Sequence, residues 1–407
     1  MGRFFTLGLA LVIFGCSDTD SDVNPSPPAN ADAALPVDQG TAADADLAAD
    51  MGTPPDAQPA DMETPTIQVG YRETSLTYTP RGAAAPRTLS VSLWYPTHDT
   101  AGDFTAYQSI FVRDDVYGNA APVITASTPV MIFSHGRCGF SQYSFFLTEY
   151  FARSGWLVAA PDHTGDVLNI ECTEQGTAAI FEQRPQDISA VIDFLGSLPD
   201  DDALANAAVT EVAMVGHSFG GYTGLVASGA QFAVEYLQAA CGSEENGAIC
   251  DDLAESATRL AEGYHDPRIK VHAAMAPGDY RILREGVADI DIPTLLMTAS
   301  SDLNNPNEVD GDPIWAQLDG PSDRRVRFDR AGHFTFTSIC TLTGARGVDN
   351  GCSDNMVAPE DFHPVINTYV MAFLRRHLLG DETGGALLDG EESIHEHVTV
   401  VVPEPAP

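Results

Sequence analysis

The sequence predicts an α/β fold with a doubly wound, mostly parallel sheet and helices on both of its faces. Short, continuous apolar runs, which are typical of strands buried on both faces, alternate with segments of helical periodicity. In the segment 182–198, for example, Ile188, Val191 and Leu195 recur at helical spacing. Strands that alternate with helices in this way form parallel units. The apolar runs are Pro129–Ser134, Trp156–Pro161, Val212–Val215, Lys270–Ala276, Ile292–Thr298 and Arg325–Phe328.

Further elements are expected before and after this series. Thr66–Thr79 and Arg87–Tyr95 alternate apolar and polar residues, which predicts two antiparallel strands ahead of the main sheet. The segment 98–127 is expected to be an irregular insertion. Toward the C-terminus, 363–379 is amphipathic and is predicted to be a closing helix, and 398–402 could add an edge strand.

The sequence Gly216-His217-Ser218-Phe219-Gly220 follows one of the apolar runs and precedes a segment of small apolar residues. A G-x-S-x-G motif between a strand and a helix is typical of a nucleophile elbow, in which a sharp turn exposes the serine. Ser218 is therefore the candidate nucleophile, and the N–H of Phe219 is the candidate first donor of an oxyanion hole. A glycine-rich turn that only allows close packing is the structural alternative.

One further motif and two further residues fit nucleophilic catalysis by Ser218. The run that ends at residue 134 is followed by H-G-x-x-G, the position of a second oxyanion donor, which we assign to the N–H of Arg137. His333, after the last run, is the candidate base. Asp302, directly after an apolar strand, is the preferred acid, and Asp279, one strand earlier, is the alternative. A serine attacks once an imidazole takes its proton, and a carboxylate orients that imidazole.

The order Ser218, Asp302, His333 and several short motifs resemble the α/β-hydrolases, in particular platelet-activating-factor acetylhydrolases and dienelactone-hydrolase-like esterases. The resemblance implies the α/β-hydrolase fold and a serine esterase of carboxylic esters, with a short acyl group favoured. A polyester or lipid hydrolase of cutinase type and an inactive hydrolase fold used for binding are the alternatives. The motifs are F-S-H-G at 133–136, G-W-L-V-A-A-P-D-H at 155–163, R-P-Q-D-I at 184–188, G-H-S-F-G-G at 216–221 and A-G-H-F at 331–334.

Four regions differ in composition. Residues 1–16 place one Arg before an apolar run too short to span a bilayer, which predicts a signal peptide. This peptide ends in I-F-G-C, which resembles a lipobox with Cys16 as the lipidated residue; ordinary secretion without Cys16 is the alternative. Residues 17–65 are expected to be a disordered acidic tether. The catalytic domain is expected at 66–380 and an acidic tail at 381–407.

The net charge of −38 argues against nucleic acid and against anionic membrane surfaces as partners. Residues 17–65 alone hold eleven acidic residues and no Lys or Arg. The expected partner is a small-molecule, lipid or polymer ester, and membrane association is expected only through the lipid anchor on Cys16. The expected location is the outer membrane or cell surface, or otherwise the exterior after secretion.

Six cysteines remain after Cys16, an even number that suggests disulfides in an exported protein. Proximity in the sequence favours Cys241–Cys250 and Cys340–Cys352, which leaves Cys138 with Cys172; a zinc site is the alternative, although no C-x-x-C spacing supports it. No cofactor is expected. The oxygen-rich segment 302–312 is either a Ca²⁺ site or, as we favour, a solvated acidic loop.

Overall fold

The computed structural model describes residues 66–168, 172, 179–241, 250, 253–343 and 350–403. The chain divides into two compact units, Met1–Met62 and Glu63–Pro407, and every described residue belongs to the second. The expected signal peptide and acidic tether lie outside the described residues. Within the described segments, no helix is both long and apolar enough to cross a membrane.

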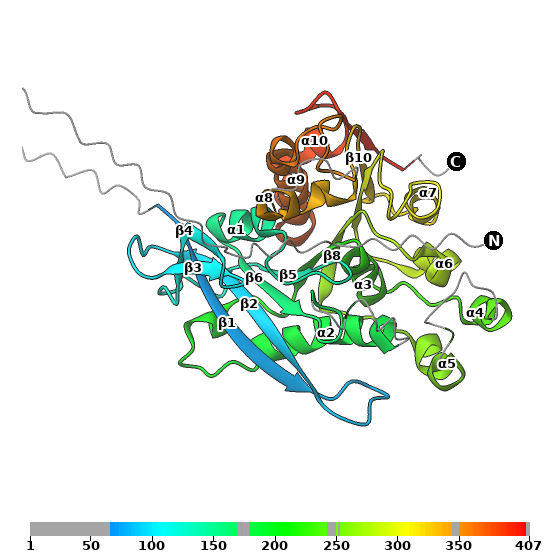
Figure 1. Ribbon diagram of the computed structural model, residues 1–407, viewed down its shortest axis with the longest axis horizontal. Helices are drawn as coiled ribbons and strands as arrows, with labels where there is room; N and C mark the ends of the chain where they lie inside the picture. The colour runs from blue at the N-terminus through cyan, green and yellow to red at the C-terminus, as the bar shows by residue number, and fades with distance from the viewer. Residues whose placement is uncertain are drawn as a thin grey trace, which may run out of the picture. The chain divides into compact units, whose positions relative to one another are not determined.

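A single large sheet organises the described residues (Figure 1). Its strands lie in the order β11-β10-β9-β8-β7-β5-β6-β2-β1-β4-β3. The neighbours from β10 across to β6 are parallel, as the alternation of strands and helices predicts. The strands are β1 (Gln68–Tyr78), β2 (Arg87–Thr97), β3 (Phe104–Tyr107), β4 (Phe111–Gly118), β5 (Val130–Ser134), β6 (Leu157–Asp162), β7 (Val212–His217), β8 (Ile269–Met275), β9 (Thr294–Ala299), β10 (Arg324–Phe328) and β11 (Val398–Val401).

Helices cover both faces of the parallel strands, which explains why the central strands of this series are mostly apolar. In β5, Met131 and Phe133 belong to one apolar cluster, which includes residues of α1 and α9, while Val130 and Ile132 belong to another, which includes residues of α2. The helices are α1 (Phe145–Arg153), α2 (Ala179–Gly196), α3 (Phe219–Ala227), α4 (Val234–Ala240), α5 (Leu253–Glu262), α6 (Tyr280–Leu283), α7 (Gly311–Trp315), α8 (Ile339–Thr343), α9 (Pro359–Leu374) and α10 (Gly385–Leu388).

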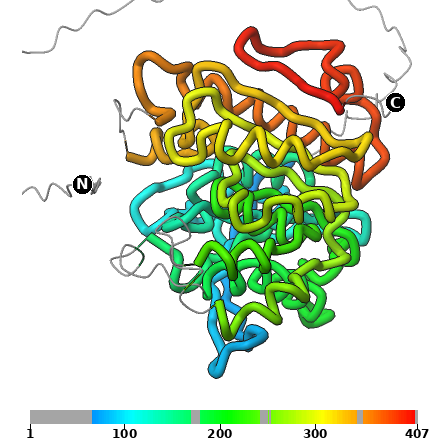
Figure 2. The backbone as a smooth tube through the Cα atoms, turned by 90° about the vertical axis from the view of Figure 1, so that its right-hand side faces the viewer, coloured from blue at the N-terminus to red at the C-terminus, as the bar shows by residue number. Residues whose placement is uncertain are grey.

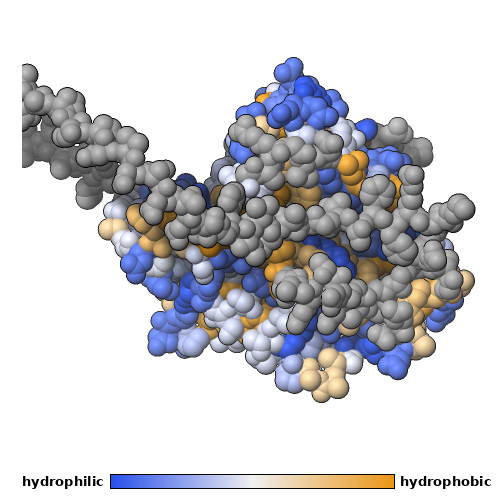
Figure 3. Space-filling model, in the orientation of Figure 1, coloured by the Kyte–Doolittle hydropathy of each residue, from blue (hydrophilic) through white to orange (hydrophobic). Residues whose placement is uncertain are grey.

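The C-terminal third of the chain gathers at one side of this unit, where its orange and red segments lie together in Figure 2. β11 pairs antiparallel with β10 and forms one edge of the sheet, so residues from the segment 381–407 complete the same sheet as the rest. On the face shown in Figure 3, hydrophilic side chains cover the region around α10 at the top, in keeping with the polar composition of that segment.

The other edge of the sheet differs from the sequence prediction. β1 and β2 are antiparallel, as expected. The segment 98–127, expected to be irregular, instead contains the antiparallel pair β3 and β4, and β4 adds to the sheet parallel to β1. The turn between β3 and β4 passes through Gln108 and Ser109, both with positive φ. Neither residue is a glycine or an asparagine, so the usual sequence signal of a hairpin is absent there.

Candidate active site

Ser218 lies at the sharp turn between β7 and α3 with φ 56° and ψ −121°, a conformation that costs energy for any residue with a side chain. The two motif glycines make this turn possible. A Cβ on Gly216 would lie 2.1 Å from the carbonyl oxygen of Gly220, and a Cβ on Gly220 would lie 2.0 Å from that of Ser134. The Ser218 N–H donates to the carbonyl of Met275 at the end of β8 (2.9 Å). The local structure is therefore that of a nucleophile elbow.

The structure brings Ser218, His333 and Asp302 together from the carboxyl ends of β7, β10 and β9. The Ser218 hydroxyl lies 2.9 Å from Nε2 of His333, and Nδ1 of His333 lies 2.8 Å from Oδ2 of Asp302. The other carboxylate oxygen of Asp302 accepts the backbone N–H groups of Asn304 and Asn305. His333 and Asp302 are buried, whereas Ser218 is partly exposed. The serine is therefore the member of the set that a substrate can reach.

Asp279, the alternative acid, follows β8 and makes no hydrogen bond with His333 among the described residues. Its carboxylate instead lies 3.5 Å from the guanidinium of Arg281. Burial raises the pKa of Asp279, and the nearby charges of Arg281 and Arg137 counteract this shift. The geometry therefore favours Asp302 as the partner of the imidazole.

The loop after β5 provides the second candidate oxyanion donor. The N–H of Gly136 donates to the Tyr143 hydroxyl (3.0 Å), and the N–H of Cys138 donates to Oδ1 of Asp166 (3.1 Å). In the described parts of the chain, the N–H groups of Arg137 and Phe219 have no acceptor. These two donors, assigned from the sequence, are thus available to a negatively charged oxygen.

Arg184, a buried arginine that the sequence analysis did not single out, fixes the loop after β5 through its hydrogen bonds. The guanidinium of Arg184 is 2.7 Å from Asp166 and 3.0 Å from the Ser134 hydroxyl, and it also donates to the carbonyl of His135. It lies 4.9 Å from the ring centroid of Phe219, so a cation–π contact joins the loop to the elbow. A buried charge requires such a set of partners, which in turn fixes the positions of the loop atoms.

A second hydrogen-bonded set of serine, histidine and aspartate consists of Ser134, His163 and Asp187. Nε2 of His163 accepts the Ser134 hydroxyl (2.9 Å), and Nδ1–H of His163 donates to Asp187 (2.8 Å). All three side chains are fully buried, so no substrate reaches this serine. Burial and the charge of Arg184 hold the pKa of His163 well below its usual value. The His163 ring is thus a neutral link between Ser134 and Asp187, and Asp187 also pairs with Arg87 (2.8 Å).

His217, the second residue of the elbow motif, connects the oxyanion loop to His333. Its Nδ1 accepts the Tyr143 hydroxyl, which itself accepts the Gly136 N–H. Its Nε2–H donates to the carbonyl of His333 (3.0 Å). Burial, followed by the charge of His333, holds the pKa of His217 well below the usual range, so the ring is a neutral linker. The sequence places His217 inside the elbow motif but assigns it no role.

All three predicted disulfides are confirmed: Cys138–Cys172, Cys241–Cys250 and Cys340–Cys352. The first ties the oxyanion loop to residue 172. The only cluster of potential metal ligands in the described residues is Cys138, Asp166 and Cys172. Its two cysteines form a disulfide with each other.

The three aspartates of the acidic segment 302–312 contact protein groups, whereas Glu308 is exposed. Asp310 accepts the N–H of Tyr280, and Asp312 pairs with Arg325 at 2.7 Å. Together with the bonds of Asp302 described above, these contacts take up carboxylate oxygens that a Ca²⁺ ion would require. The structure therefore offers no positive support for the calcium alternative.

No protein-family model matches the chain, and no curated protein matches its sequence. Among solved structures, the chain is similar to a ferulic acid esterase from Streptomyces cinnamoneus, with a TM-score of 0.60 and 22% sequence identity. The similarity covers 85% of this chain and 98% of that protein. At this identity the likeness establishes the fold, and the chain has the α/β-hydrolase fold. The resemblance to the acetylhydrolase and dienelactone-hydrolase groups stays a prediction.

Proposed function

We propose that the protein is a serine hydrolase of carboxylic esters. The observation that carries the proposal is the hydrogen-bonded series Ser218–His333–Asp302, with its serine partly exposed on a nucleophile elbow. His333 takes the serine proton as Oγ attacks the ester carbonyl, and then gives a proton to the leaving alcohol. Asp302 fixes the imidazole with Nδ1 protonated and stabilises its charged form. Water then hydrolyses the acyl-enzyme by the same steps.

The N–H groups of Phe219 and Arg137 stabilise the oxyanion of each tetrahedral intermediate in this proposal. Both lack an acceptor in the described residues, and both belong to backbone held by buried contacts. Donors fixed in this way need no rearrangement during the reaction, which is why an oxyanion hole contributes strongly to the rate. An inactive binding module, the alternative class, would have no need for a strained serine and two unsatisfied donors beside one imidazole.

The acyl group is proposed to be short, on the basis of the resemblance to acetylhydrolases. The ferulic acid esterase similarity adds aromatic acyl esters as a second class to be tested. The three disulfides are typical of proteins that fold outside the cytosol, and they support the proposal that the chain is exported. Attachment to the outer membrane through Cys16 is part of the same proposal.

The experiment measures hydrolysis of p-nitrophenyl esters from acetyl to palmitoyl, and of methyl ferulate, by the oxidised protein. Ser218→Ala should lower kcat by at least about 10⁴-fold, because it removes the proposed nucleophile. Asp302→Asn should also cause a large loss, on the order of 10⁴-fold, because the imidazole loses its orienting partner. The matched variant Asp279→Asn should stay within about threefold of the wild type, since Asp279 does not contact His333.

The chain-length profile then separates the substrate classes. A maximum at acetyl or butyryl supports the acetylhydrolase-like proposal, and a maximum at long chains supports the cutinase-type alternative. A preference for methyl ferulate supports an aromatic acyl group. If the folded wild type hydrolyses none of these esters, the proposal of a general ester hydrolase is wrong.

A further inference from the structure

Asn350 connects the loops that carry the candidate base and acid. Its Oδ1 accepts the backbone N–H of His333 (2.9 Å) and also that of Leu303 (3.0 Å), the residue after Asp302. Its Nδ2 donates to the side-chain oxygen of Asn304 (3.1 Å). The residue is only 6% exposed. One buried amide therefore sets the distance between the two backbone segments from which the imidazole and the carboxylate project.

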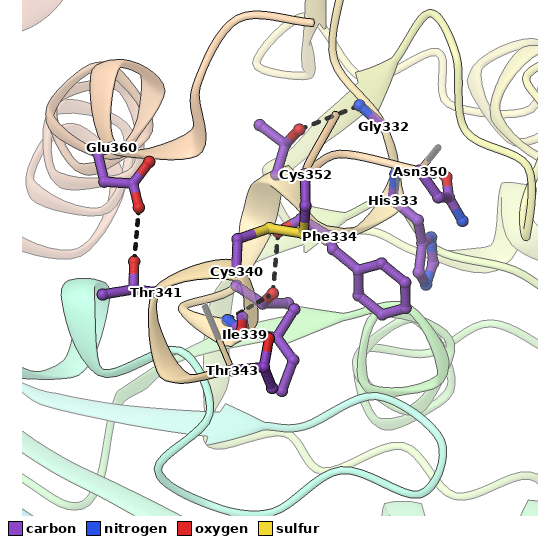
Figure 4. The surroundings of a disulfide bond; sticks show 12 residues. Gly332, His333, Phe334, Ile339, Cys340, Thr341, Thr343, Asn350, Cys352 and Glu360 are labelled. Carbon is purple, nitrogen blue, oxygen red and sulfur yellow. Dashed lines mark hydrogen bonds between the residues drawn. A yellow bond between two sulfur atoms is a disulfide. The ribbon is translucent and has the colours of Figure 1, made fainter. Parts of the chain in front are cut away.

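The backbone of Asn350 contacts the same histidine loop. Its carbonyl accepts the N–H of Phe334 (2.8 Å), and a Cβ on Gly332 would lie 2.3 Å from its carbonyl carbon. Figure 4 shows Asn350 beside His333, with Gly332 and Phe334 on the same loop. The close approach requires glycine at position 332. Both the side chain and the main chain of Asn350 thus restrict where His333 can lie.

A disulfide fixes the chain directly after Asn350. Cys352 is bonded to Cys340 in α8, the short helix that follows the histidine loop (Figure 4). α8 is itself attached to α9, because the Thr341 hydroxyl donates to Glu360 (2.7 Å). The disulfide therefore joins the segment that carries Asn350 to a helix that is hydrogen-bonded to α9.

We propose that Asn350 is a positioning residue for the reacting histidine, and that the Cys340–Cys352 disulfide holds Asn350 in place. The inference rests on the proposed function, because it assigns a role toward His333 acting as a base. Asn350 does not touch the reacting atoms. It acts by keeping Nδ1 of His333 aligned with Asp302 and Nε2 aligned with Ser218, and misplacement by about 1 Å at such a site can cost about 10²-fold in rate.

Two substitutions at position 350 test the positioning role. Asn350→Ala removes the shared acceptor, and kcat should fall about 10- to 100-fold with KM within about twofold. The acidic limb of the pH–rate profile should also move to lower pH, because a less well aligned Asp302 stabilises the charged imidazole less. Asn350→Asp keeps an acceptor for both N–H groups, so it should retain more of kcat than Asn350→Ala. Its added negative charge should move the acidic limb to higher pH.

The opposite directions of these pH shifts separate positioning from a general loss of stability. A variant that only unfolds more easily would lower the active fraction and leave the profile of the remaining enzyme unchanged. Asn350→Asp also keeps the test valid if Asn350→Ala does not fold. Wild-type kcat and an unmoved profile in both variants would overturn the proposal.

A double-mutant cycle tests the role of the disulfide. The variant Cys340→Ser/Cys352→Ser should lower kcat, and adding Asn350→Ala to it should have a much smaller effect than in the native chain, because both changes release the same contact. The matched control is Cys241→Ser/Cys250→Ser, which removes a disulfide that closes a different loop, after α4. The control should leave kcat within about twofold. Full additivity of the two changes would refute the link between the disulfide and Asn350.

Failure of the proposed function would give a different result. If the wild type hydrolyses no ester, the function is wrong, and the ¹H resonance of the hydrogen-bonded Nδ1–H of His333 then serves as the readout. That resonance should be present in the wild type and shifted or broadened in Asn350→Ala. An unchanged resonance would overturn the positioning role independently of any substrate.

Discussion

Tyr143→Phe removes one oxygen atom that two elements of the proposed active site share. The Tyr143 hydroxyl accepts the N–H of Gly136 and donates to Nδ1 of His217. It also packs tightly, since a Cβ on Gly136 would lie 2.6 Å from it. Burial raises the pKa of Tyr143 and lowers that of His217, so a neutral hydroxyl faces a neutral imidazole and the hydrogen bond persists across the working pH range.

The magnitude follows from the two polar groups that the change leaves behind. A buried donor or acceptor without a partner costs about 1–3 kcal/mol, so the two together should cost about 2–6 kcal/mol. Some of this appears as a lower free energy of unfolding. The rest appears in catalysis, because Gly136 precedes the Arg137 donor and His217 holds the carbonyl of His333. We expect kcat to fall about 10- to 100-fold, somewhat less than the complete loss of an oxyanion donor.

The assay combines urea unfolding with steady-state hydrolysis of the best p-nitrophenyl ester. The matched control is Tyr150→Phe in α1, the helix that begins two residues after Tyr143, because that ring is 36% exposed and its hydroxyl has no partner in the described structure. The control should change neither quantity appreciably. If Tyr143→Phe has the stability and kcat of the wild type, the hydroxyl does not connect the two loops and the reasoning is refuted.

Two further changes test the packing and the charges around the site. Gly220→Ala should give little soluble protein and no activity, because its Cβ would lie 2.0 Å from the Ser134 carbonyl oxygen, whereas Gly196→Ala, with 3.6 Å to its nearest neighbour, should be tolerated. Asp310→Asn concerns a carboxyl whose pKa is raised from 3.8 to about 6 by burial. The folded protein binds this proton more tightly than the unfolded chain does. Ionisation of Asp310 therefore lowers the free energy of unfolding as pH rises through 6, and has no effect on it below about pH 4, where the carboxyl is protonated in both states. The variant should therefore be more stable than the wild type at pH 7–8, by at most about 3 kcal/mol in urea unfolding, and equal to it at pH 4. An equal gain at both pH values would contradict this account.

The central part of the fold could be predicted because its sequence signals are physical requirements. Parallel strands buried on both faces must be mostly apolar, and β5, β7, β8 and β9 are. The elbow could be located because Gly216 and Gly220 leave no room for a side chain. The preference for Asp302 over Asp279 came only from its place after an apolar strand.

Other features gave no signal in the sequence. The β3–β4 hairpin turns through Gln108 and Ser109, residues that rarely adopt positive φ, so no turn motif marks it. Tyr143 and Asn350 act through a few hydrogen bonds, most of them to residues distant in the chain, and tyrosine or asparagine in a loop has many ordinary roles. Arg184 lies within a motif, but its burial becomes evident only once the strands are assembled. The side chains that position an active site do so through contacts between residues distant in the sequence, and local sequence patterns carry no signal of such contacts.

The edge position of β11 has a consequence for the order in which the molecule is built. β10 leads directly to His333, and its outer partner is β11, with Val326 opposite Val400. A growing chain therefore exposes the open edge of β10 until β11, about 70 residues further along the chain, has been synthesised and has paired with it. An open strand edge attracts other chains, so this interval is the period of greatest risk of aggregation. Mutations in β11 should accordingly reduce the yield of folded protein more than the activity of the molecules that do fold.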